Sequence, residues 1–457
     1  MNAALRRVAI AAAILLGARS LPGVWADLTA YVQLGVLPGW IVVDLAAPRV
    51  ARPVRWALAL AAGPLIAACA GYGLMALGRD TVGAARLLAW AMPVAWVASG
   101  SLRARVATAR GAGDPDPPLP AAVPWMALGL ATAVALVPIL DPFIAVRGDS
   151  WAHGAIALRI LDSGVPPEDP RFAAIQLHYV WFYNLFVALL AGLRGHSPFG
   201  FMVMLNVATA FATTALAGAI AFDLARRREA AIGGAGLAIA GFNAGAWLLW
   251  PINLGRALTG DVRGLPEIVR ELRGIEIGHA RIIYSLAAPL AHMTSMLDKV
   301  LVGSPMAYGY LLMIVHLWAV MRWLARGGAM HLAWIAAAAA GMMLIHGVVG
   351  LSVIPVWIGT LALAWLLRLR LPWLPSSGRL AGAAAATLAG GLVTAPYMIS
   401  VASGWAAGQS GLHHHYVDPD PRMLWTLVTA CGVTLWFARA PALAAWRERS
   451  PAAAVLG

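Results

Sequence analysis

A polar stretch at residues 139–198 holds the side chains best suited to chemistry in this chain. Asp149 and His153 are four residues apart in DSWAHGAIALRILDSG, whose apolar spacing predicts a helix that ends at Gly164. Residues four apart share one helix face, so the carboxylate and the imidazole would lie together. They would then act as a base and its orienting partner, or Asp149 would hold a metal ion. The alternative is that Asp149 only caps the helix and His153 is an interfacial histidine.

The same stretch ends in an aromatic segment that carries two further candidates, His178 and Tyr179. Aromatic side chains of this kind suit the level of the lipid headgroups. We therefore expect residues 178–193 to form a re-entrant or interfacial helix rather than a full span. His178 and Tyr179 would then contribute to a substrate-binding site beside Asp149.

A second polar stretch, residues 251–305, offers three cationic candidates. His279 and Arg281 precede apolar sequence and could bind a phosphate group. Lys299 follows Asp298 directly, and it could either pair with that carboxylate or contact an anionic lipid headgroup.

A third polar stretch, residues 402–422, contains the sequence HHHYVDPDPR. Adjacent histidines cannot all face one metal ion in a helix or strand, which argues against a structural zinc site. A loop that folds over a substrate is the better interpretation, with substrate contacts from His413, His414, His415 and Arg422. His346 lies at the end of another apolar segment. It either packs in the core or lines a cavity that the three polar stretches cover.

The composition places these side chains on a membrane protein. Of 457 residues, 61% are hydrophobic and 12% are charged, about half the charged fraction of a soluble protein. The net charge of +13 comes from short arginine clusters between apolar runs, a pattern that sets membrane orientation. The expected partner is therefore the lipid bilayer, and nucleic acid is not an expected partner.

The apolar segments predict an all-α, polytopic helical bundle with about twelve membrane spans. The corresponding windows are 8–24, 29–46, 56–78, 84–101, 121–138, 199–222, 231–250, 306–324, 331–347, 350–367, 380–400 and 423–438. The predicted organisation is N-terminal membrane helices (1–138), an outer loop with juxtamembrane helices (139–198), membrane helices (199–250), a second outer loop (251–305), and C-terminal membrane helices with a third outer loop (306–457, loop 402–422).

Orientation follows from the arginine clusters. If the N-terminus is cytoplasmic and the spans alternate, every cluster falls on the cytoplasmic side, as the positive-inside rule requires. Both termini are then cytoplasmic, and the three polar stretches share the extracytoplasmic face. The clusters are Arg6, Arg7, Arg49, Arg52, Arg55, Arg103, Arg105, Arg110, Arg226–Arg228, Arg322, Arg326, Arg368, Arg370, Arg439, Arg447 and Arg449.

The run GDSWAHGAIALRILDSGVPPEDPRF…LHYVWFYNLFVALLAGL, together with the earlier LGVLPGWIVVDL, resembles bacterial members of the GT-C superfamily of membrane glycosyltransferases. The resemblance implies juxtamembrane helices in the first large outer loop and a place in the bacterial plasma membrane. It implies a polyprenyl-phosphate-linked sugar as donor and a glycan, lipid or protein as acceptor. The activity it implies is an inverting transfer on the outer face.

The resemblance also implies roles for particular residues. Asp149 would be the general base or a metal-site residue, with Mg²⁺ or Mn²⁺ as the divalent cation. Arginine, lysine or histidine side chains of the other outer loops would bind the carrier phosphate. The residues leave an alternative open, in which the chain is a transporter or flippase, or a non-catalytic assembly protein, for lipid-linked glycans.

Overall fold

The structure is a computed structural model in which every regular element is a helix. It describes residues 3–47, 50–109, 116–140, 149–171, 175–240, 296–301, 303–368 and 374–406, with Val146, Thr259 and Leu371 as isolated positions. Within these ranges there is no β-strand, and β-pairing is limited to one isolated bridge between Glu168 and Gln176. The all-α prediction is confirmed for this part of the chain.

Within the described ranges, seven helices are long and apolar enough to cross a membrane, so the chain is a multi-pass helical bundle. The first is composite, because α2 (Gly23–Tyr31), a π-helical turn η1 (Val32–Val36) and α3 (Leu37–Ala46) follow one another without a break. The other six are α4 (Arg52–Ala76), α5 (Thr81–Ala109), α6 (Ala122–Leu140), α9 (Pro198–Ala225), α15 (Pro305–Arg326) and α17 (Gly347–Leu367).

The remaining predicted spans differ from full membrane helices or lie outside the described residues. Helices α1 (Ala3–Ser20) and α16 (Ala329–Ile345) are not among the seven. Helix α10 (Arg228–Ala240) covers only the first part of the window 231–250, whose remainder lies outside the described residues. Helices α18 (Ser377–Val393) and α19 (Ala395–Ala406) are bent by 47° at their junction and would count as an eighth span together. The window 423–438 lies outside the described residues, so the total of twelve stays a prediction.

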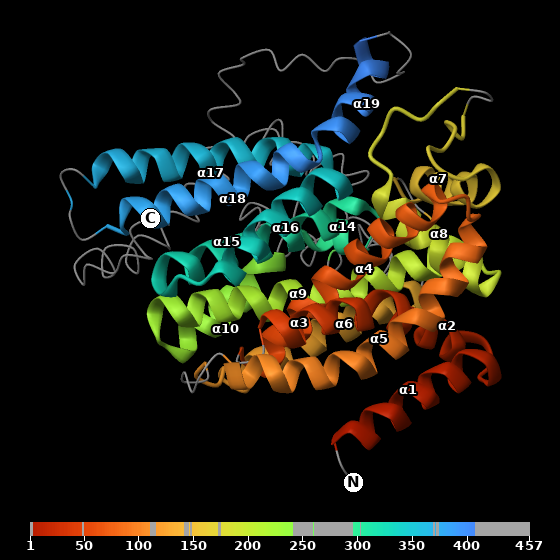
Figure 1. Cartoon of the computed structure of the whole chain (residues 1–457), viewed down its shortest axis with the longest axis horizontal. Coiled ribbons are helices and arrows are strands. Elements are labelled where there is room, and N and C mark those ends of the chain that lie inside the picture. Colours follow the sequence, from red (N-terminus) through yellow and green to blue (C-terminus); the bar gives the residue numbers. More distant parts are fainter. Residues whose placement is uncertain are drawn as a thin grey trace.

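The long helices lie side by side with their axes roughly along the long axis of the molecule (Figure 1). Helices α7 (Asp149–Ser163) and α8 (Phe182–Arg194) lie at the right-hand end of this view, and α10 lies towards the left. Helix α8 packs against α4, α5, α7 and α9. The end that carries α7 and α8 is therefore built from segments that are far apart in the sequence.

Helix α8 corresponds to the predicted re-entrant or interfacial helix over residues 178–193, and it is not among the helices long enough to cross a membrane. It begins later, at Phe182, and ends where Gly195 adopts a left-handed conformation, with φ of 67°. Its 13 residues extend about 20 Å, less than the hydrocarbon thickness of a bilayer. The side chains from Phe182 to Ala191 are all buried, because other helices surround them. Burial in the bundle, rather than contact with lipid headgroups, therefore accounts for their apolar character.

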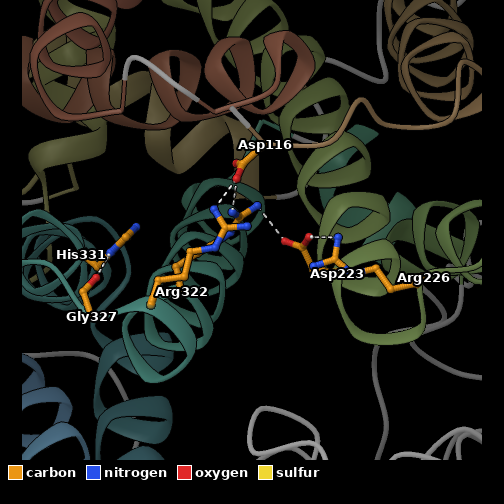
Figure 2. A network of polar contacts seen from close by, with 7 residues as sticks. Asp116, Asp223, Arg226, Arg322, Gly327 and His331 are labelled. Atoms are coloured by element: carbon orange, nitrogen blue, oxygen red, sulfur yellow. Dashed lines mark hydrogen bonds and ion pairs between the residues drawn. The ribbon is translucent and has the colours of Figure 1, made fainter. Parts of the chain in front are cut away.

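Two groups of buried ion pairs lie among the arginine clusters. In the first group, the fully buried carboxylate of Asp44 contacts Arg7 and Arg55, each at 2.6 Å. In the second group, Arg322 lies between Asp116 at 2.6 Å and Asp223 at 2.7 Å (Figure 2). Such contacts offset the cost of burying each charge.

The second group joins two of the arginine clusters predicted to share one side of the membrane, and Asp116 ties them to the loop before α6. Asp223 also contacts Arg226 at 3.5 Å, and Asp116 also contacts Arg326. Burial alone would raise the pKa of Asp116, but the ion pairs with Arg322 and Arg326 outweigh it and hold the pKa below its usual range. The loop before α6, the end of α9 and the end of α15 thus meet at one end of the bundle. Which side of the membrane this end faces remains a prediction.

Candidate functional site

Helix α7 confirms the predicted helix, since it begins at Asp149 and ends at Ser163. Gly164 follows with φ of 83°, a left-handed conformation that terminates the helix. One face of α7 buries Ile156 and Ile160 against the bundle. The backbone carbonyl of Ile160 accepts a hydrogen bond of 2.8 Å from the Thr81 hydroxyl at the start of α5. These contacts fix the helix at the end of the bundle.

The first turn of α7 brings Asp149 close to a cation from a distant segment. Lys299 belongs to α14 (Met296–Leu301), and its Nζ lies 3.8 Å from Oδ2 of Asp149. The Asp149 side chain is 62% exposed, whereas the Lys299 side chain is 20% exposed. The carboxylate is thus open to a ligand, while the ammonium group is held largely inside the protein.

The approach of these two segments is fixed by Ser150. Its buried Oγ accepts a hydrogen bond of 2.8 Å from the backbone N–H of Gly303. A Cβ atom on Gly303 would lie 3.1 Å from that Oγ and 2.5 Å from the side chain of Met202. A larger residue at position 303 would therefore have to displace the end of the Met202 side chain and crowd the Ser150 hydroxyl.

His153 is buried one helical turn after Asp149. Its Nδ1 lies 3.2 Å from Oδ1 of Asn184, and its ring contacts those of Tyr179 and Tyr183 at centroid distances of 5.8 Å each. Burial lowers the pKa of His153 to about 4, although the Asn184 contact and the Asp149 charge oppose the shift. His153 is therefore neutral at pH 7. Asn184 and the two tyrosines fix the orientation of its ring.

His346 lies between α16 and α17, and Nδ1 accepts a hydrogen bond of 3.2 Å from the backbone N–H of Val349. Burial, reinforced by the charge of Lys299, lowers the pKa of His346. The neutral imidazole with Nδ1 as acceptor carries its proton on Nε2. His346 thus has a defined tautomer, with Nε2 as a hydrogen-bond donor.

Tyr179 is the fifth member of this group. Burial raises its pKa to about 12, and the nearby negative charge of Asp149 adds to the shift. The negative charge of Asp149 also acts on His346, where it raises the pKa and so opposes the larger lowering by burial. These contacts and charge interactions bring five predicted site residues together, and we call them the α7 cluster: Asp149, His153, Tyr179, Lys299 and His346.

Other predicted site residues lie elsewhere or outside the described residues. His178 lies near Asp169, whose pKa is lowered chiefly by a hydrogen bond from Arg171 and, to a smaller extent, by His178. His178 thus belongs with the loop between α7 and α8. The residues outside the described ranges are His279, Arg281, His413, His414, His415 and Arg422.

A divalent cation at Asp149 does not fit the described residues well. Within the described ranges, no three or more histidine, cysteine, aspartate or glutamate side chains come together where a metal ion could bind. Asp149 supplies the one carboxylate of the α7 cluster, and the ammonium group of Lys299 beside it would repel Mg²⁺ or Mn²⁺. We derive no reaction step through a metal.

Two residues that position the cluster, Ser150 and Asn184, were not predicted from the sequence. Ser150 follows Asp149 at the start of the helix, where serine is common, so its residue type did not indicate a special role. Asn184 is the one amide side chain within the otherwise apolar and aromatic segment FYNLFVALL. This isolated polar residue was the feature of the sequence that could have indicated its structural role. A buried amide in such a segment requires a polar partner, and His153 provides it.

Comparison of the chain with protein-family models, with curated proteins and with solved structures finds no match.

Proposed function

We propose that the chain is a membrane glycosyltransferase and that the α7 cluster is its active site. The reaction would move a sugar from a polyprenyl-phosphate donor to a hydroxyl group of a glycan, lipid or protein. The observation that carries the proposal is the exposed carboxylate of Asp149, 3.8 Å from the ammonium group of Lys299. The base can remove the proton of an acceptor hydroxyl. The cation can stabilise the negative charge on a departing phosphate.

In the proposed reaction, Asp149 is the general base. The acceptor hydroxyl loses its proton to Asp149 as its oxygen forms a bond to the anomeric carbon of the sugar. The bond between that carbon and the phosphate oxygen breaks, and the phosphate leaves with the electron pair. Attack from the side opposite the phosphate inverts the anomeric configuration. Positioned acid–base groups of this kind contribute about 10²–10⁴ to a rate.

Lys299 would stabilise the charge that develops on the leaving phosphate. Its ammonium group is largely buried, and a cation in such an environment interacts more strongly than one in bulk water. The protonated Nε2 of His346 and the hydroxyl of Tyr179 supply further donors at the cluster. His153 is a positioning residue in this scheme, because it is buried against Asn184 and the two tyrosines.

The membrane-spanning bundle supports a lipid-linked donor, because it would hold the cluster near the bilayer in which a polyprenyl chain is dissolved. The extracytoplasmic location of the cluster is part of the proposal. It is supported by the arginine-rich end with Arg226, Arg322 and Arg326. A basic end of this kind is typical of the cytoplasmic side.

The test is a transfer assay in membranes that contain a pool of polyprenyl-phosphate sugars. Asp149→Asn keeps the size of the side chain and removes its charge, so the rate should fall by about 10²–10⁴ at equal expression. Asp162→Asn is the matched control, because Asp162 is an exposed carboxylate on the same helix that pairs with Arg159. Equal product from wild type and Asp149→Asn would remove Asp149 as the base.

A transporter or flippase for the same kind of substrate is the second candidate. The observation in its favour is the 47° bend between α18 and α19, since interrupted helices often line transporter sites. In reconstituted vesicles, a transporter would move a polyprenyl-phosphate sugar between leaflets without releasing the phosphate carrier. A transferase would consume the donor, and would do so only when an acceptor is present.

A further inference from the structure

A cavity of about 210 Å³ lies between α1, α2, η1, α5 and α8, and its lining includes no member of the α7 cluster. Two arginines, Arg86 and Arg194, line it together with Gln33. The rest of the lining is apolar and includes Trp90. The cavity thus combines cationic and polar groups with an apolar wall.

Gln33 is the buried polar group of this cavity. Its side chain belongs to a residue that is 2% exposed, and its Oε1 has no hydrogen-bond partner among the described residues. A buried carbonyl oxygen without a hydrogen-bond donor destabilises the protein. A ligand group that donates a hydrogen bond, such as a hydroxyl of a lipid headgroup, would remove this cost.

Arg194 is held in position by an ion pair. Its Nε lies 2.9 Å from Oδ1 of Asp27, and the same carboxylate lies 3.1 Å from Nδ1 of His196. Asp27 offsets one positive charge at the cavity. With two arginines and one carboxylate, the cavity keeps a net positive charge.

Arg86 supplies the second positive charge. It lies in the apolar span Thr81–Gly100, about 7.5 Å along the axis from the start of the helix. Within the described residues, no carboxylate pairs with it. A charged side chain in a membrane helix is costly and usually marks a ligand or a functional group. An anionic headgroup would provide the missing counter-charge.

The place of the cavity in the bundle indicates where such an anion would come from. Arg86 lies near the beginning of α5, which is joined to α7 by the hydrogen bond from Thr81 to Ile160. Trp90, one helical turn further along α5, is 47% exposed. Its ring could cover an acyl chain while the guanidinium groups hold a phosphate at the end of the bundle.

We propose that this cavity binds the phosphate headgroup of an anionic phospholipid of the surrounding bilayer. Arg86 and Arg194 bind the phosphate oxygens, the Gln33 carboxamide hydrogen-bonds to the polar headgroup, and an acyl chain packs along Trp90. This inference does not depend on the glycosyltransferase proposal, because none of its residues belongs to the α7 cluster.

The test measures the lipid retained by the full chain in detergent, by native mass spectrometry after titration with phosphatidylglycerol or phosphatidylcholine. We expect one tightly held phosphatidylglycerol per chain and at least about tenfold weaker binding of phosphatidylcholine, a difference of about 1.4 kcal/mol. Arg86→Gln should weaken phosphatidylglycerol binding to the same extent. Arg79→Gln is the matched control, because Arg79 is an exposed arginine just before α5 that does not line the cavity.

Gln33→Leu provides an independent variant of similar size. It should lower the affinity for phosphatidylglycerol while it preserves the fold, which thermal unfolding of the same sample would verify. Equal retention of the two lipids, or unchanged phosphatidylglycerol binding by both Arg86→Gln and Gln33→Leu, would overturn the proposal. Competition by inorganic phosphate at the same concentration as the lipid would also overturn it, since the ligand would then be a small anion.

Discussion

Ser150 and Gly303 are 153 positions apart and are joined by a buried hydrogen bond of 2.8 Å from the Gly303 N–H to the Ser150 Oγ. This bond fixes the first turn of α7 against the chain that connects α14 to α15. Asp149 precedes Ser150, and Lys299 lies shortly before Gly303. The distance between the proposed base and the proposed phosphate-binding cation therefore depends on a hydroxyl group that need not take part in the chemistry.

Ser150→Ala should destabilise the protein and disturb this pairing. The variant leaves a buried N–H without an acceptor, which costs about 1–3 kcal/mol. Denaturant unfolding in detergent would measure this loss. Ser163→Ala on the same helix is the control, because the exposed hydroxyl of Ser163 bonds only to the carbonyl of Arg159 one turn earlier. Equal stability of the two variants would contradict the role given to Ser150.

The buried neutral His153 predicts a loss of stability in acid. Its pKa is about 4 in the folded protein and 6.5 in the unfolded chain, so the unfolded state binds the proton first. The stabilisation is fully present above about pH 6.5 and is lost as the pH falls towards 4. The loss is at most about 3 kcal/mol.

The check on His153 compares the unfolding temperature of wild type and His153→Gln between pH 7 and pH 4. Other groups titrate in both proteins, so the difference between the two curves isolates His153. We expect wild type to lose more stability than the variant over this range. Parallel curves would mean that His153 is accessible to protons in the folded state.

Several features of the fold and the site could be predicted from the sequence. Apolar length predicted the seven long helices, because the hydrocarbon thickness of a bilayer requires it. The spacing of apolar residues and Gly164 predicted α7 with its correct start and end. Residue type alone selected Asp149, His153, Tyr179, Lys299 and His346, since ionisable or polar groups are expensive in an apolar chain.

The partners of these residues could not be predicted. Lys299 was expected to pair with its neighbour Asp298 or with a lipid, and in the structure it lies beside Asp149. Such contacts depend on tertiary packing, which local sequence patterns do not reveal. The sequence left open, for a related reason, whether α8 is re-entrant within the bundle or interfacial. Its aromatic residues suit a headgroup region and a protein core equally well, and only the helices around it decide between them.

The buried charges at the arginine-rich end should contribute strongly to stability. Arg322→Met leaves the carboxylates of Asp116 and Asp223 without their shared partner, and breaking a buried pair in this way costs about 3–5 kcal/mol. Arg326→Met changes a side chain that is 46% exposed and should cost at most about 1 kcal/mol. Thermal unfolding of both variants in detergent would compare them. A similar loss in both would show that Arg322 has no special structural role.

The contact between α3 and α4 should tolerate no side chain larger than glycine at its centre. A Cβ atom on Gly63 would lie 1.9 Å from the backbone oxygen of Gly35, and one on Gly39 would lie 1.9 Å from that of Ala59. Backbone cannot move aside as a flexible side chain can, so Gly63→Ala should push α4 away from η1, the turn that contains Gly35. Close helix packing through small residues is a main source of stability in membrane bundles.

Gly73→Ala is the control for this substitution, because Gly73 lies in the same helix and has open space around the added atom. Alanine has a higher helix propensity than glycine, so Gly73→Ala should be neutral or stabilising by up to about 1 kcal/mol. Gly63→Ala gains the same propensity but must displace the backbone of η1, and overpacking of this kind costs about 1–3 kcal/mol or more. Thermal unfolding should therefore give shifts of opposite sign or clearly different size. A stabilising effect of Gly63→Ala equal to that of Gly73→Ala would show that η1 and α4 do not pack this closely.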